Sequence, residues 1–164
     1  MNRTIVFFNY RVAGVCIQDG KVLLHRSEED NFWTLPGGRC EIGELSADTI
    51  VREMMEETGA SFRVIRLLFV IENMFIYHKT RCHEIGFYYL LEPETSGDAN
   101  KTRGHFFGRE GVIKLAFDWF SVDSLTDMEI YPAPLKTALL SLSDSICHLS
   151  IKNKIFDFST VLFH

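Results

Sequence analysis

The sequence lacks the patterns that several common classes of protein require. Its four cysteines, at positions 16, 40, 82 and 147, never stand in a CxxC spacing, so neither a zinc ribbon nor a thioredoxin-type redox motif is present. No apolar run approaches the roughly 20 residues of a membrane-spanning helix, and the N-terminus lacks the pattern of a signal peptide. We therefore expect reduced thiols and a cytoplasmic protein with no membrane partner.

Positive charge is also scarce. The chain has 17 Lys and Arg against 22 Asp and Glu, and a net charge of -5. Such a chain has no overall basic surface for nucleic acid, so we do not expect a nucleic-acid partner. An anionic ligand would need a metal ion or a few local arginines. The sequence is compatible with a homodimer and does not require one.

Length and composition predict one compact unit. The 164 residues are 46% hydrophobic and 13% aromatic, which is enough to fill a single core. No internal repeat or low-complexity linker divides them. We therefore expect one domain over residues 1–164.

Apolar periodicity and turn-forming residues predict alternating strands and helices. Strands are expected at 4–17, 21–26, 62–77, 82–92 and 115–122, and helices at about 47–58 and 134–149. Gln18-Asp19-Gly20 is typical of a hairpin turn. Residues 93–111, which carry four glycines together with Pro, Thr, Ser and two Asp/Asn positions, predict a long loop. The tail, 151–164, fits either a further strand or an interface element.

The stretch 38–60, GRCEIGELSADTIVREMMEETGA, is the most informative part of the chain. Seven charged or glycine residues stand there at fixed offsets: Gly38, Glu44, Arg52, Glu53, Glu56, Glu57 and Gly59. With each residue type at roughly one in fifteen, a chance match at seven positions has odds on the order of one in 10⁸. An ordinary charged helix is therefore a poor explanation.

The chemistry of this stretch follows from helical geometry. Ser46 as N-cap and Gly59 as C′ residue predict the helix ends. Glu53, Glu56 and Glu57 then fall within an arc of about 100°. Their repulsion costs a few tenths of a kcal/mol per pair, and Arg52 offsets only part of it. A divalent cation would supply the rest, and oxygen ligands without His or Cys favour Mg²⁺ or Mn²⁺ over Zn²⁺. Because Mg²⁺ often shares its shell with phosphates, a diphosphate or polyphosphate substrate is expected.

The spacing G-x5-E-x7-R-E-U-x-E-E-x-G-U, where U is a bulky aliphatic, resembles the signature of the Nudix (MutT-like) hydrolases. Met54 and Ala60 stand where the family usually has Ile, Leu or Val, and no charged or glycine position departs. Trp33 belongs to a Trp-x-x-Pro-Gly-Gly pattern of many members. The resemblance implies an α/β/α sandwich with a central mixed β-sheet. The expected fold class is therefore α/β (α+β).

The resemblance also implies roles for the site residues. The carbonyl of Gly38 and the carboxylates of Glu53, Glu56 and Glu57 would bind the metal. Glu44 would bind metal through water or pair with Arg52, and the sequence does not separate these roles. The residues before the helix, Leu35-Pro36-Gly37-Gly38, are expected to form a tight turn that approaches the ligand.

In these hydrolases water attacks one phosphorus of a diphosphate bridge, and the general base differs among members. Some place it on the loop that corresponds to 93–111, where Glu110 is our candidate and Glu94 a weaker one. One of the carboxylates of the helix is the alternative. Glu84 lies in a predicted strand and is left unassigned.

The sequence says less about which residues recognise the rest of the substrate. Arg26, Arg39 and Arg81 are candidates for phosphate contacts. The candidates for stacking on a base are Phe75, Tyr77, Phe117 and Tyr131.

The first functional hypothesis is a metal-dependent hydrolase that cleaves a nucleoside diphosphate linked to another group. A nucleoside triphosphate, a nucleotide sugar or a dinucleoside polyphosphate would each fit. The second is a regulatory module that senses a nucleotide without turnover, for which loss of a catalytic glutamate would be expected. The third is a pyrophosphohydrolase of RNA 5′ ends, for which a basic groove with interleaved aromatics would be expected.

Overall fold

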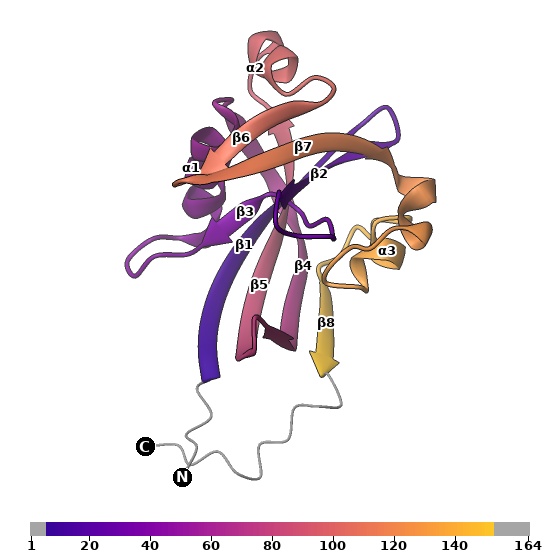
Figure 1. The fold of residues 1–164 in the computed structure, drawn as a ribbon. Coiled ribbons are helices and arrows are strands. Elements are labelled where there is room, and N and C mark those ends of the chain that lie inside the picture. The colour runs from indigo at the N-terminus through magenta and orange to yellow at the C-terminus, as the bar shows by residue number, and fades with distance from the viewer. Residues whose placement is uncertain (1–5, 153–164) are drawn as a thin grey trace, which may run out of the picture.

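A computed structural model describes residues 6–152 (Figure 1). In chain order the elements are β1 (Val6–Gln18), β2 (Lys21–Ser27), β3 (Gly37–Arg39), α1 (Ser46–Thr58), β4 (Phe62–Tyr77), β5 (Thr80–Pro93), α2 (Ser96–Lys101), β6 (Phe106–Glu110), β7 (Ile113–Ser121), the 3₁₀ helix η1 (Val122–Asp127), α3 (Leu135–Ala138) and β8 (Cys147–Lys152). The hairpins β1–β2 and β4–β5 and the helix α1 lie where the sequence predicts them, within one to three residues.

The strands form one mixed sheet. Their order is β6-β7-β2-β1-β5-β4-β8, and β3 pairs with β1 outside that path. The pairs β1–β5 and β4–β8 are parallel, whereas the others are antiparallel. The expected central mixed sheet is thus confirmed.

The sheet divides along β1. Strand β2 pairs with β1 only at its end, through Ile17 with Val22 and Gln18 with Lys21. Strand β3 pairs with an earlier part of β1, residues 11–13. Consequently β2, β7 and β6 turn away from the first half of β1, and in Figure 1 they cross above the long strands β1, β5 and β4. The large cavity described below opens between these two parts.

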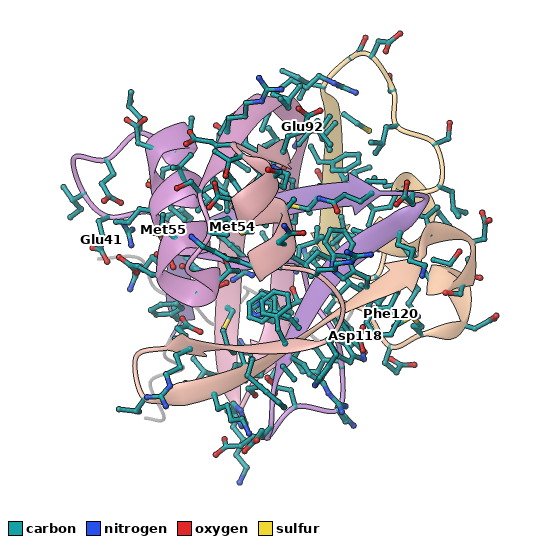
Figure 2. All side chains as sticks on the ribbon, turned by 90° about the horizontal axis from the view of Figure 1, so that it is seen from above. Glu41, Met54, Met55, Glu92, Asp118 and Phe120 are labelled. Carbon is teal, nitrogen blue, oxygen red and sulfur yellow. The ribbon has the colours of Figure 1, made fainter. Side chains whose placement is uncertain are left out.

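A helical layer covers each face of the sheet. On one face Ile50 and Met54 of α1 are fully buried in a cluster with Val12 of β1, and Figure 2 shows Met54 on the inner side of α1, with Met55 and Glu41 farther out. On the other face Leu125 of η1 and Leu135 of α3 pack against further sheet residues. The α/β/α arrangement is therefore confirmed, and Met54 fills a core position as its thioether allows.

The prediction of a long C-terminal helix at 134–149 is wrong. Helix α3 ends at Ala138, and Cys147–Lys152 form the edge strand β8, parallel to β4. Two local signals explain this. Ser141, Ser143 and Ser145 compete for backbone hydrogen bonds and disfavour a helix. The following residues alternate in exposure with the period of two that a strand requires.

The prediction of a long loop at 93–111 is also wrong. The short helix α2 starts there because the Thr95 hydroxyl accepts a hydrogen bond from the Asp98 amide (3.1 Å), a capping pattern visible in Thr95-x-x-Asp98. Asp98 in turn accepts from the Ser61 amide at 3.0 Å, which ties α2 to the start of β4. Strand β6 then forms a hairpin with β7 around Gly111.

Two local predictions beside α1 need correction. Gly37 and Gly38 lie in the short strand β3 and not in a tight turn, because they pair with β1. Ser46 is the first helical residue, its hydroxyl bonds that of Tyr89 at 2.6 Å, and Leu45 occupies the N-cap without a side-chain bond. Gly59 ends the helix in the left-handed region, at φ 70°, as predicted.

Residues 151 and 152 of the tail lie in β8, and 153–164 lie outside the described residues. No helix within residues 6–152 has the length and apolar character needed to cross a bilayer.

Candidate active site

Helix α1 carries four charged residues of the motif, and one of them, Arg52, bonds to Glu53 and Glu56 of the same helix and to Glu44 of the preceding loop. Its guanidinium makes two parallel bonds to Glu44, Nε to Oε1 and Nη2 to Oε2, each 2.9 Å long. Its Nη1 donates to Glu53 at 2.9 Å and to Glu56 at 3.2 and 3.3 Å. The bonds from Arg52 and Thr49 lower the pKa of Glu44 to about 2. Glu44 thus pairs with Arg52, one of its two predicted roles.

Strand β3 holds the carboxylate of Glu53 at close range. A Cβ on Gly38 would overlap that carboxylate, and a Cβ on Gly37 would overlap the Val12 backbone. The two glycines are therefore needed for close approach of backbone to backbone and of backbone to carboxylate. This brings Gly38 and Glu53, two of the four predicted metal ligands, side by side.

Glu57 is the most unusual group of the motif. It is only 3% exposed, and neither carboxylate oxygen has a hydrogen-bond partner in the structure. Burial raises the pKa of Glu57 well above its usual range; Arg11 and, more weakly, the nearby backbone amide of Gly37 oppose this shift, and Glu110 and Glu53 add to it. A buried carboxylate without partners costs free energy, so this position is typical of a functional group.

Glu56 differs from its neighbours because it is exposed. Its side chain is 57% accessible and its contact in the structure is the ion pair with Arg52. Burial raises the pKa of Glu53 as well, and the charges of Glu56 and Glu110 contribute to that shift. The three carboxylates therefore share one electrostatic neighbourhood, as the helical spacing predicts.

A cavity of about 1280 Å³ opens where the two parts of the sheet diverge. Its lining includes the buried Gly37 and Glu84, the half-buried Arg11 and the exposed Glu110, together with loop residues that follow β2 and η1. Glu110, at the end of β6, influences the pKa of both Glu53 and Glu57. The candidate base thus lies beside the motif. Glu94 is exposed and does not line this cavity.

The candidate residues for substrate recognition differ in whether they line the cavity. Arg26 lines the cavity and stacks over Trp33 at 4.9 Å, whereas Arg39 lies outside it, over the ring of Phe7. Arg81 is not among the lining residues. Phe75, Tyr77 and Tyr131 line the cavity.

Phe117 is unsuited to stacking on a substrate, because it is fully buried between His25 and Phe106. The sequence prediction for it is wrong because aromatic composition does not reveal which side of a strand faces the core.

Of two charged residues that line the cavity, sequence reasoning missed Arg11 and left Glu84 unassigned. Arg11 lies on β1 and Glu84, which is only 6% exposed, on the neighbouring strand β5. A signal was available for Arg11, since it shares the inward face of β1 with the apolar Ala13 and Val15. A lone charge at such a position indicates a site.

The residues of the motif fit a hard divalent cation. Within residues 6–152 no three Asp, Glu, His or Cys side chains already converge in the way a metal site requires. The donor chemistry nevertheless agrees, because Glu57 has two unsatisfied buried oxygens and Glu53 is held against the backbone of Gly38. Oxygen donors of this kind suit Mg²⁺ or Mn²⁺.

Comparison with known proteins gives related families and folds. An ADP-ribose pyrophosphatase of Methanocaldococcus jannaschii is 33% identical over 113 residues, 65% of this chain and 66% of that protein. Diphosphoinositol polyphosphate phosphohydrolase 2 of Mus musculus is 31% identical over 113 residues, 66% of this chain and 63% of that protein. The chain thus spans less than two thirds of the length of such curated relatives.

A solved structure shares the fold. The ADP-ribose pyrophosphatase of Streptococcus suis has a TM-score of 0.56 at 19% identity, covering 87% of this chain and 98% of that one. The model of the NUDIX domain matches residues 9–139, which contain the motif, strands β2 to β7 and β1 from Asn9 onward. The chain belongs to the Nudix family.

Proposed function

We propose that this protein is a metal-dependent pyrophosphohydrolase that cleaves the diphosphate of a nucleoside diphosphate linked to a sugar or a similar hydroxylated group. The observation that carries the proposal is Glu57, a buried carboxylate without hydrogen-bond partners that lies near Glu53 and Glu110. Relatives whose names state a pyrophosphatase or phosphohydrolase activity support the reaction class.

Gly38 through its carbonyl, and Glu53, Glu56 and Glu57 through their carboxylates, would hold Mg²⁺ or Mn²⁺. When bound, such an ion supplies Lewis acidity to the phosphoryl oxygens. Arg52 would then keep its two bonds to Glu44 and fix the loop before α1. Glu44 and Arg52 would therefore act as positioning residues, and the other carboxylates of the motif would hold the ion.

The chain's own groups would handle the proton. The oxygen of a water forms a bond to one phosphorus, the bond from that phosphorus to the bridging oxygen breaks, and the bridging oxygen leaves on the second phosphate. The proton released by the water passes to a carboxylate and then to solvent. Glu110 is our candidate for that carboxylate, because it lines the cavity beside the motif; a carboxylate of α1 is the alternative.

The charge of the cavity favours a substrate with few phosphates. Carboxylates outnumber cations among its lining residues: the acids are Glu28, Glu29, Asp30, Glu84 and Glu110, and the bases are Arg11, Arg26 and Lys114. A heavily phosphorylated ring or an RNA 5′ end would be repelled there. Sugar hydroxyls can instead donate hydrogen bonds to carboxylates.

An aromatic corner at the outer part of the cavity suits a nucleobase. Phe32 lies edge to face with Tyr131 at 5.2 Å and with Tyr77 at 6.4 Å, and both tyrosines are about half exposed. The Tyr77 hydroxyl donates to Asp30 at 3.2 Å, which fixes its ring. Bases stack on exposed aromatics of this kind.

A substrate panel tests the proposal. ADP-ribose, a nucleoside triphosphate, a dinucleoside polyphosphate, a diphosphoinositol polyphosphate and a triphosphorylated RNA would be incubated at millimolar Mg²⁺, and their products quantified. We expect ADP-ribose to have the highest kcat/KM, with hydrolysis abolished by EDTA. Preference for the inositol compound or for RNA would contradict the substrate class. Nucleotide binding without any turnover would favour a sensor.

A further inference from the structure

Arg11 is a cation at the inner part of the cavity. It lies on β1 opposite Arg39 of β3 and beside Gly86 of β5. Its Nη2 donates to the carbonyl of Leu35 at 3.0 Å, just before the glycines that hold Glu53. The guanidinium has further N–H donors, and Arg11 lines the cavity. A half-buried cation that lines a cavity can bind an anion there.

Glu84 and Asn9 form the setting of that cation. They are directly opposite each other on the parallel strands β5 and β1, and Asn9 Nδ2 donates to Glu84 Oε2 at 2.7 Å. The pKa of Arg11 is raised overall: burial acts to lower it, but the nearby negative charges outweigh burial, and Glu84 is the largest of them. Glu84 is buried and held by an amide, so it provides a fixed countercharge.

The other cations of the cavity have different contacts. Lys114 pairs with Glu28 at 3.0 Å, and Arg26 stacks over Trp33 at the outer part. Arg11, in contrast, is close enough to Glu57 and Glu110 to influence and be influenced by their charges. Of these three cations it is the one next to the proposed reaction centre.

We propose that Arg11 binds phosphoryl oxygens of the substrate's diphosphate, and that Glu84, held by Asn9, is the residue that positions the Arg11 guanidinium. This inference rests on the proposed function for the identity of the ligand. The planar fork of a guanidinium matches phosphoryl oxygens in a way that an ammonium does not. The specificity for a single diphosphate would then follow from one such cation among surrounding carboxylates.

The competing explanation is purely structural: Arg11 would only neutralise Glu84. Two variants separate these roles. Arg11→Gln removes the cation and leaves the negative charge of Glu84 without its countercharge. Arg11→Gln combined with Glu84→Gln removes both charges, so the local charge balance is kept and the fold is not burdened by an uncompensated charge. If Arg11 only balances charge, the double variant should behave as the wild type does.

Binding without turnover measures the role directly. Calorimetric titrations in EDTA with ADP-ribose and with adenosine would compare the wild type, both variants and Arg63→Gln, an exposed control that pairs with Glu92. We expect wild type and control to prefer ADP-ribose, and both Arg11 variants to lose at least about tenfold in ADP-ribose affinity with adenosine affinity unchanged. Arg11→Lys should recover only part of the loss.

The inference is overturned if the double variant binds ADP-ribose as tightly as the wild type, if Arg11→Gln binds it normally, or if the wild type shows no preference for ADP-ribose over adenosine. Because these titrations need no catalysis, they give an answer even if the substrate panel shows no hydrolysis. Thermal melting of each variant confirms that it is folded at the titration temperature.

Discussion

At the scale of one residue, Glu57 is a carboxylate whose surroundings cost the fold free energy. Its carboxylate is nearly inaccessible and has no hydrogen-bond partner. Stabilising substitutions are common at such functional positions, because the native residue is retained for activity. The same buried oxygens that destabilise the fold are those available to a cation.

This leads to a prediction about pH. Burial raises the folded-state pKa of Glu57 above its unfolded value, so the folded state binds more protons in the interval between the two. Stability contributed by the neutral carboxyl is therefore lost as pH rises above about 4.5. Without metal, Glu57→Gln should be more stable than the wild type by about 1 kcal/mol at pH 8, or about 3 °C in Tm, with a smaller gain at pH 5.

Melting curves in EDTA at both pH values check this, with Glu56→Gln as the control because Glu56 is exposed. The control should show no such pH-dependent gain. A Glu57→Gln protein that melts below the wild type at pH 8 would contradict the burial argument.

At the scale of elements, the short strand β3 is important because its backbone lies directly against the Glu53 side chain of α1. A methyl group on Gly38 would overlap the Glu53 carboxylate. We predict that Gly38→Ala displaces Glu53, lowers kcat/KM for ADP-ribose at least about tenfold and costs about 1 to 3 kcal/mol of stability.

Gly97→Ala is the matched control for that substitution. Gly97 lies in α2, and a Cβ there would meet only the Thr95 hydroxyl at an ordinary 3.5 Å. Alanine also favours a helix. Activity should therefore stay at the wild-type level in the control. Wild-type kcat/KM in Gly38→Ala would show that the close approach of β3 has no functional role.

The elements also show which structural features a sequence reveals. Helix α1 and the hairpins are predictable because their signals are local: an αL glycine, an apolar stripe, a tight turn. The predicted helix at 134–149 failed because the alternation of Cys147, Leu149 and Ile151 matters only once β4 offers an edge to pair with. The family resemblance implied four metal ligands, and their roles stay predictions.

At the scale of the whole molecule, the cavity is assembled from strands that are distant in the sequence. Arg11 of β1 and Glu84 of β5 are brought near each other only by the pairing of their strands, which is why spacing along the chain did not predict their proximity. The motif therefore indicates the reaction class. The topology that surrounds it determines which substrate fits.

The aromatic corner gives a prediction about substrate selection. Tyr131 is half exposed at the outer part of the cavity and packs against Phe32. If a base stacks there, Tyr131→Ala should raise KM for ADP-ribose about tenfold and leave kcat within about twofold, because stacking contributes about 1 to 3 kcal/mol per base.

Steady-state kinetics measure this, with Ile146→Ala as the control because Ile146 is 58% exposed and does not line the cavity. The control should match the wild type in both constants. An unchanged KM in Tyr131→Ala would place the base elsewhere.

The most direct measurement of the central claim compares ADP-ribose hydrolysis by the wild type and by Glu57→Gln at millimolar Mg²⁺, with and without EDTA. Release of AMP and ribose 5-phosphate would be followed, and Glu92→Gln would serve as the control because Glu92 is exposed and pairs with Arg63. We predict EDTA-sensitive hydrolysis by wild type and control, and a loss of at least about 100-fold in Glu57→Gln. Equal turnover by Glu57→Gln and the wild type would contradict the account.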